Sequence, residues 1–293
     1  MSNDKLGNND HDLLFQKKGP VTRIILNRPH ACNALTMSVQ KKLHEAVRKV
    51  RFDSETRVVI FEGTGGHFCA GDDIKEMPVL GTRVLSAEID GIVEGAAQHD
   101  PNVHFNHIRM FQETAAMVED LDAITISKVE GVCMGGGLEL TLCCDFVLAT
   151  EDSRWGMPEV DMGITPGWGG CTRMQRFVGR RKAKEINLVA YEFSGVQAKE
   201  FGLVNRLVAH EQLEAETQAL ADLMLAKNRY ALRRSKFVLN KAAEGHMAQA
   251  SAFEVPVDPS AGLGSGLDGI NAFAEKNMDW LSAREKSKTF WQD

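Results

Sequence analysis

The amino-acid sequence predicts an α/β fold in which a layered sheet core is followed by a helical C-terminal subdomain. Short β-branched runs alternate with helical patterns through the first two thirds of the chain, and amphipathic helices fill the last third. Strands that alternate with helices favour a sheet covered by helices. The chain has 293 residues, 43% of them hydrophobic and 25% charged, which is typical of a globular protein with a large core.

The first elements follow from local patterns. Residues 21–29, VTRIILNRP, are β-branched and end at a proline, so they predict a strand and a turn. Residues 37–50 repeat apolar side chains with the period of a helix. Residues 57–63, RVVIFEG, form a continuous apolar stretch, which is typical of a strand buried on both faces. For residues 78–109, which include the run HDPNVHFNH, we expect a partly helical excursion with an irregular loop.

The middle of the chain repeats the order strand, glycine-rich turn and helix. Residues 124–132, ITISKVEGV, predict a third strand. It leads into the glycine triplet 135–137, which is followed by a helix. Short strands are expected around 146–149, before the Gly/Pro-rich loop 155–170.

The last third is predicted to be helical. The sequence SGVQ at 194–197 indicates a capping box that opens a helix. Residues 211–227 and 229–244 have the pattern of two amphipathic helices. Residues 256–269 form a breaker-rich linker before a last helix, 270–286.

Composition excludes several classes of function. The net charge is −6, whereas a duplex-binding protein usually has a basic surface, so nucleic acid is not expected as a partner. No run of about 18 apolar residues predicts a membrane span. Residues 1–12 are polar, resemble no signal or transit peptide and are expected to be a disordered tail. The six cysteines have no CxxC or zinc-ligand spacing, so we expect buried, reduced thiols and a cytoplasmic protein.

The sequence CMGGGLEL, residues 133–140, places three glycines between a strand and a helix. Glycine lets the backbone approach a ligand closely, and the first amides of a helix are free to bind an oxyanion. A tight junction without any ligand explains the same pattern about equally well. Glu139 lies in the first turn of this helix, where it either complements the helix dipole or is a buried carboxyl with a raised pKa.

A second carboxylate, Glu159, follows 20 residues later in a loop made rigid by Pro158. The alternative is an ordinary exposed loop acid. If both carboxylates face one cavity, they can hold a water molecule between them, one taking its proton and the other giving a proton to carbon. The segment HFCAGDDIKEM, residues 67–77, offers a further backbone donor at Asp72, although a capped helix start explains it too. The spacing of His99, His104 and His107 matches no standard metal site, so no metal is expected.

The segment 67–77, the segment 133–140 and the loop around Glu159 follow one another in a fixed order. In this order they resemble the motif set of the enoyl-CoA hydratase/isomerase (crotonase) superfamily. The resemblance extends from NRPHACNAL at 27–35 to INAFAEK at 270–276. It implies a crotonase-like (ββα)-type spiral core over residues 13–200. It also implies a helical C-terminal subdomain over 201–293 that serves oligomerisation and CoA contacts.

The resemblance also implies roles for individual residues. The amides of Asp72 and Gly136 would form the oxyanion hole for the thioester carbonyl. Glu139 and Glu159 would be catalytic; we expect Glu159 to protonate Cα and Glu139 to activate water, although the opposite assignment stays open. The substrate-binding residues implied by the motif match are Asp72, Asp73, Ile74, Lys75, Gly136, Phe273 and Lys276.

The implied function is hydration of an enoyl-CoA thioester by a homotrimer or a hexamer, a dimer of trimers. CoA is part of the substrate, and no separate cofactor is implied. Asp72 stands where the family usually has a small residue, and the segment 78–111 is longer than usual, which disfavours an ordinary short-chain acyl group. Trp155 and Trp168 flank Glu159 and are compatible with an aromatic or cyclic acyl group, although packing of the loop explains them better. Crotonase-family isomerisation, C–C hydrolysis or hydratase–lyase chemistry therefore stay open as alternatives. A non-catalytic RNA- or protein-binding relative would be expected to lack the glutamates or to have a basic face.

Overall fold

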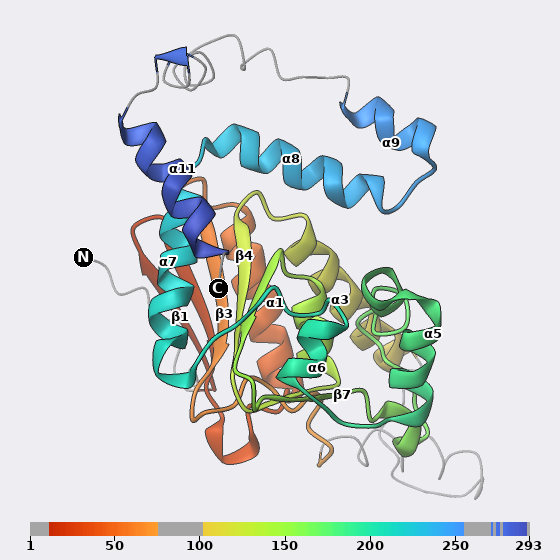
Figure 1. The fold of residues 1–293 in the computed structure, drawn as a ribbon. Coiled ribbons are helices and arrows are strands. Elements are labelled where there is room, and N and C mark those ends of the chain that lie inside the picture. Colours follow the sequence, from red (N-terminus) through yellow and green to blue (C-terminus); the bar gives the residue numbers. More distant parts are fainter. Residues whose placement is uncertain (1–11, 76–101, 255–270, 272–273, 276–277, 292–293) are drawn as a thin grey trace, which may run out of the picture.

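The computed structural model describes residues 12–75, 102–254, 271, 274–275 and 278–291 (Figure 1). The predicted tail, the linker 256–269, Phe273 and Lys276 fall wholly or almost wholly outside these residues. No helix in the described ranges is both long enough and apolar enough to cross a membrane.

The main sheet has six strands in the order β1-β2-β3-β4-β6-β9. Its strands are β1 (Leu13–Lys18), β2 (Val21–Leu26), β3 (Val58–Gly63), β4 (Ile124–Val129), β6 (Phe146–Ala149) and β9 (Arg206–Leu207). Strands β1 and β2 are antiparallel, and every later pair is parallel. The strands predicted at 21–29, 57–63, 124–132 and 146–149 are confirmed, whereas β1 has no counterpart in the prediction.

The glycine triplet 135–137 directly follows a strand of a second, smaller sheet. Its strands are β5 (Val132–Met134), β7 (Arg154–Gly156) and β8 (Phe193–Ser194), in that order. Strand β5 follows β4 directly and pairs in parallel with β7. The carboxyl end of β5 therefore meets the segment that follows β7, and this brings two distant parts of the sequence to one place.

Helices cover both faces of the main sheet (Figure 1). On one face, Val59 and Phe61 of β3 belong to the large core with helix α1. On the other face, Val58 and Ile60 pack with helix α7 in a second cluster. The alternation confirms that this strand is buried on both sides. The helices are α1 (Met37–Arg51), α3 (Asn102–Glu119), α4 (Gly136–Leu142), α5 (Met174–Val189), α6 (Gly195–Glu200), α7 (Leu213–Leu225), α8 (Arg229–Ala242), α9 (Met247–Glu254) and α11 (Met278–Phe290).

The predicted capping box is confirmed, because the Ser194 hydroxyl accepts from the amide of Gln197 while the Gln197 side chain accepts from that of Ser194. Most of the segment 78–109, expected to be partly helical with an irregular loop, lies outside the described residues, and its described part is helical. The run NVHFNH is the first part of α3, whose later turns bury Phe111 and Ala115. The thiols are free, as expected, but Cys171 is exposed and Cys32 is half-buried rather than buried.

Candidate active site

Two backbone segments meet where the small sheet joins the core. Residue 72 forms a parallel bridge with Leu35, and Cys69 forms another with Cys133, so the 69–72 segment lies between these two neighbours. Gly71 has a φ of +85°, and a Cβ added to it would lie 3.0 Å from the Met134 carbonyl oxygen and 3.1 Å from the Gly136 nitrogen. A glycine is therefore required for this close approach.

The approach leaves two amides free at one junction. Asp73 N donates to Leu35 O at 3.0 Å, and Gly135 N donates to a carbonyl of β7 at 3.0 Å. The amides of the two neighbouring residues, Asp72 and Gly136, donate no hydrogen bond to any described residue. Gly136 is the first residue of α4, where the amide has no partner within the helix. Two such donors beside each other can hold an oxyanion.

Glu139 extends from the first turn of α4 and is only 2% exposed. Its Oε1 accepts hydrogen bonds from Trp168 N at 2.9 Å and Gly170 N at 2.6 Å. Oε2 bonds to no described residue, and this leaves one carboxyl oxygen for a ligand or water. Burial raises the pKa of Glu139 to about 8, with a contribution from Glu159, while the two amides act in the opposite direction.

Glu159 begins the short 3-10 helix η3 (Glu159–Met162) and is 7% exposed. Its Oε1 faces the glycine turn, because a Cβ added to Gly135 would lie 2.8 Å from it. Its Oε2 is buried and has no hydrogen-bond partner among the described residues. Burial raises the pKa of Glu159 to about 7, and the charge of Asp72 adds to the shift.

Asp72 brings a third carboxyl group to the same place. Its Oδ1 accepts from Gln40 Nε2 at 3.0 Å and would lie 3.5 Å from a Cβ on Gly136. Burial raises the pKa of Asp72 to about 6. The site therefore contains three carboxyl groups that are easier to protonate than in water, so each can exchange a proton near neutral pH.

The remaining predicted substrate-binding residues are placed differently. The carboxylate of Asp73 is buried and pairs with Arg28 at 3.0 Å, so this side chain already has a partner. Ile74 is 62% exposed, and Lys75 is exposed too. Phe273 and Lys276 lie outside the described residues.

The structure adds four groups that the sequence reasoning missed: Gln40, Trp168 N, Gly170 N and Arg173, which donates to Trp168 O at 2.7 Å. Gln40 is buried among the apolar residues of α1, three positions before Leu43. A polar residue within an apolar helical face was the available signal. The two amides gave no signal, because a backbone donor has no sequence identity.

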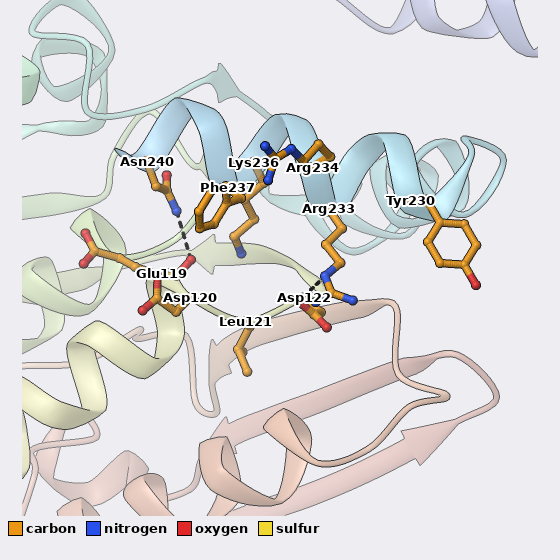
Figure 2. A pocket seen from close by; sticks show the side chains of 10 residues that line it. All are labelled: Glu119, Asp120, Leu121, Asp122, Tyr230, Arg233, Arg234, Lys236, Phe237 and Asn240. Atoms are coloured by element: carbon orange, nitrogen blue, oxygen red, sulfur yellow. Dashed lines mark hydrogen bonds and ion pairs between the residues drawn. The ribbon is translucent and has the colours of Figure 1, made fainter. Parts of the chain in front are cut away.

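A cavity of about 520 Å³ lies elsewhere, between α8 and the end of α3 (Figure 2). It contains neither of the two glutamates nor Asp72. Its charged groups are largely engaged: Arg233 pairs with Asp122 at 2.7 Å, and Lys236 pairs with Asp145 at 2.7 Å. The three carboxyl groups with raised pKa values therefore lie at the glycine junction and outside this cavity.

The comparison with known families agrees with the motif order. Residues 16–283 match the model of the family described as enoyl-CoA hydratase/isomerase. The chain belongs to the enoyl-CoA hydratase/isomerase family. Within the enoyl-CoA hydratase/isomerase family, the putative enoyl-CoA hydratase/isomerase YngF of Bacillus subtilis is 34% identical over 269 residues, which cover 91% of this chain and 96% of YngF.

Solved structures of enoyl-CoA hydratases share the crotonase fold. The enoyl-CoA hydratase of Bacillus anthracis superimposes with a TM-score of 0.78 at 29% identity, over 90% of this chain and 96% of that chain. A putative enoyl-CoA hydratase of Thermobifida fusca, solved in complex with CoA, has a TM-score of 0.72 at 27% identity, over 83% of this chain and 90% of that chain. The α/β architecture expected from the sequence is thereby confirmed.

Proposed function

We propose that this member of the family is an enoyl-CoA hydratase, a hydro-lyase that adds water across the α,β-double bond of an acyl-CoA thioester. The observation that carries the proposal is the pair of buried glutamates, Glu139 and Glu159, beside two free amides. Addition of water needs one group to take a proton and another to give one, and the site supplies both. The name of the B. anthracis relative supports the same reaction class.

The thioester carbonyl oxygen is held by the amides of Asp72 and Gly136. Negative charge develops on this oxygen when an oxygen atom adds to Cβ. Donors that are fixed before the reaction stabilise that charge without rearrangement. A single donor of this kind typically contributes a factor of about 10² to 10³ in rate.

One water molecule lies between the two carboxyl groups. Glu139, held by its two amide bonds on Oε1, takes a proton from the water through its other oxygen. The water oxygen forms its bond to Cβ, and the proton of Glu159 is transferred to Cα. The product is a 3-hydroxyacyl-CoA, and proton exchange with solvent restores both groups. The pKa of Glu139 is raised to about 8 and that of Glu159 to about 7, so each group has both an ionised and a protonated fraction near neutral pH. The reverse assignment, with Glu159 as the base and Glu139 as the acid, is the alternative within this proposal.

The CoA part of the substrate lies along Asp73, Ile74 and Lys75, and Phe273 and Lys276 contact its nucleotide. The CoA complex of the T. fusca relative supports a CoA thioester as ligand. A trimer or a hexamer is supported by large apolar side chains exposed on α5, such as Phe177 at 49% and Leu188 at 64%. Light scattering of the purified chain measures this assembly directly.

The acyl group is aromatic or cyclic in this proposal. Trp168, whose amide binds Glu139, packs its ring against Phe111 with centroids 5.0 Å apart. Both rings are 1% exposed and belong to the core beside the site, so aromatic side chains lie directly behind the turn that binds Glu139. Asp72 supports the second candidate, isomerase, hydrolase or hydratase–lyase chemistry on a related substrate, because it adds a third proton-exchanging group.

The test is the loss of enoyl-thioester ultraviolet absorbance with crotonyl-, longer-chain and cinnamoyl-CoA, combined with mass spectrometry. A product heavier by one water molecule supports hydration, and the best substrate defines the acyl class. Unchanged absorbance with all three esters would refute the hydratase and favour the second candidate. A shortened or ring-opened product would identify cleavage instead.

A further inference from the structure

We infer that Arg173 and Glu119 form a positioning pair that holds the Trp168–Gly170 turn against the catalytic carboxyl group of Glu139. The inference rests on the proposed role of Glu139. Neither residue of the pair touches Glu139 by a hydrogen bond, so both act through the turn.

The guanidinium of Arg173 connects three parts of the chain. Its Nε and Nη2 donate to the two carboxylate oxygens of Glu119 at 2.8 Å and 2.6 Å, and its Nη1 donates to Trp168 O at 2.7 Å. A bidentate pair fixes the orientation of the guanidinium as well as its position. The third donor then fixes the peptide group that follows Trp168.

The same turn provides both amides that bind Glu139. Trp168 N and Gly170 N lie on either side of the carbonyl that Arg173 holds. Rotation of this backbone would therefore turn both donors away from Glu139 Oε1. Gly169 has a φ of +112°, and a Cβ added there would clash with Arg173 Nη1. A glycine is thus needed for the guanidinium to lie against the turn.

The pair is anchored and partly shielded from water. The side chain of Arg173 is 17% exposed and that of Glu119 is 34% exposed. The backbone of Glu119 is held from the other side, because Asn240 of α8 donates to its carbonyl oxygen at 3.0 Å (Figure 2). An anchored ion pair loses less side-chain entropy than a free surface pair, so it can fix a geometry.

The charged and titratable groups around Glu139 determine how its pKa should respond when the turn is misplaced. Glu159, Asp72, Cys143 and Cys171 face it from the loops and from α4, and Arg173 is the cation that interacts with it in the described part of the chain. Loss of the amide bonds removes groups that favour the ionised carboxyl. Misplacement of the turn should therefore raise the pKa of Glu139.

The test compares Arg173→Lys and Glu119→Gln with the wild type. Lysine keeps the charge but cannot bind a carboxylate in two places and a carbonyl at once. We expect Arg173→Lys to lower kcat by about 10- to 100-fold with KM changed less than about twofold, because a small misplacement of a catalytic group costs this much. Glu119→Gln should have a smaller effect in the same direction. Arg154→Lys is the matched control, since Arg154 forms a similar two-bonded pair with Glu192 on the exposed surface.

A second readout does not depend on turnover. Infrared titration of the Glu139 carboxyl, isolated as the difference between each protein and its Glu139→Gln form, should show a higher pKa in Arg173→Lys than in the wild type. If both pair variants keep the wild-type kcat and the wild-type pKa of Glu139, the inference is overturned. If the wild type hydrates none of the esters but the pKa shift is found, the positioning inference stands and the proposed function fails. Should Arg173→Lys not fold, Glu119→Gln alone decides the question by the same two measurements.

Discussion

Gln40 Nε2 lies 3.0 Å from Oδ1 of Asp72, so a helix of the core holds the side chain of the residue whose amide we assign to the oxyanion hole. The same nitrogen also donates to Leu35 O at 3.1 Å, and Asp73 N donates to this carbonyl as well. Gln40 thus links α1 to both partners of the parallel bridge. The carboxyl group that it holds acts electrostatically on both glutamates.

The first prediction concerns this carboxyl group. Asp72→Ala removes a negative charge but keeps the amide, so hydration should continue. Without that charge the ionised forms of Glu139 and Glu159 are easier to form, and the pKa of each falls. The profile of kcat/KM against pH should therefore move to lower pH, by up to about one unit. Asp72→Asn, which is neutral but keeps the hydrogen bond from Gln40, should show the same shift; an unmoved profile in both variants would contradict it.

The second prediction concerns the glutamates. Glu139→Gln and Glu159→Gln should each lower kcat by about 10² to 10⁴, because each removes a proton-transfer group. Binding of a CoA thioester, measured by calorimetry, should survive, since the free amides are unchanged. Full activity in either variant would refute the mechanism with two carboxyl groups.

The third prediction links the same residue to stability. The pKa of Glu139 is raised from its ordinary value of 4.5 to about 8, so the unfolded chain loses this proton first as pH rises. The unfolded state then binds fewer protons than the folded state, and stability falls from about pH 4.5 to about pH 8. Glu139→Gln lacks this loss. The free energy of unfolding in urea is measured for both proteins, and the value for the wild type is subtracted from that for the variant. This difference should be larger at pH 8 than at pH 4.5 by at least about 1 kcal/mol, since one unit of pKa shift corresponds to about 1.4 kcal/mol.

The fourth prediction tests the close approach at Gly71. Gly71→Ala places a Cβ 3.0 Å from the Met134 carbonyl oxygen and 3.1 Å from the Gly136 nitrogen, and so displaces the oxyanion donors. We expect kcat to fall by about 100-fold. Gly66→Ala is the control: Gly66 has a similar φ of +77°, but a Cβ added there meets nothing within 4 Å. Equal losses of activity in the two variants would show that backbone strain, rather than the contact, is responsible.

The fifth prediction concerns the attachment of α8. Lys236 is 7% exposed and donates to Asp145 at 2.7 Å and to Ala123 O at 2.9 Å. Lys236→Met leaves the partly buried Asp145 carboxylate, whose side chain is 17% exposed, without its cation but with its two hydrogen bonds from Thr125, which costs about 1 to 3 kcal/mol. Urea unfolding should show this loss. Lys241→Met, at a more exposed pair with Glu244, should change stability by less than about 1 kcal/mol.

The fold could be predicted largely because its elements carry local signals. The β-branched runs gave the inner strands, and the Ser194 capping box gave the start of α6. Strand β1, LLFQKK, was missed because only its first residue is fully buried and its polar half resembles a tail. The bounds of α3 could not be predicted, because His and Asn residues hide its helical period.

The candidate site was likewise predictable in part, in its side chains but not in its backbone groups. Glu139 and Glu159 could be found, because acids within apolar or glycine-rich runs are unusual and match a known motif order. Their partners could not be found, because Trp168 N and Gly170 N are backbone groups and their aim depends on the tertiary fold. The contact between Arg173 and Glu119 joins residues 54 positions apart, and no local pattern encodes it.

The two donors assigned to the oxyanion hole belong to the main chain, and every amino acid except proline carries such a group. The positive φ that this geometry requires belongs to Gly71, whereas residue 72 has no positive φ that would restrict its side chain. A saturation library at position 72 should therefore vary the charge and shape beside the thioester while it keeps the donor. This makes the position an entry point for laboratory evolution of new acyl preferences, with Gly71 left untouched.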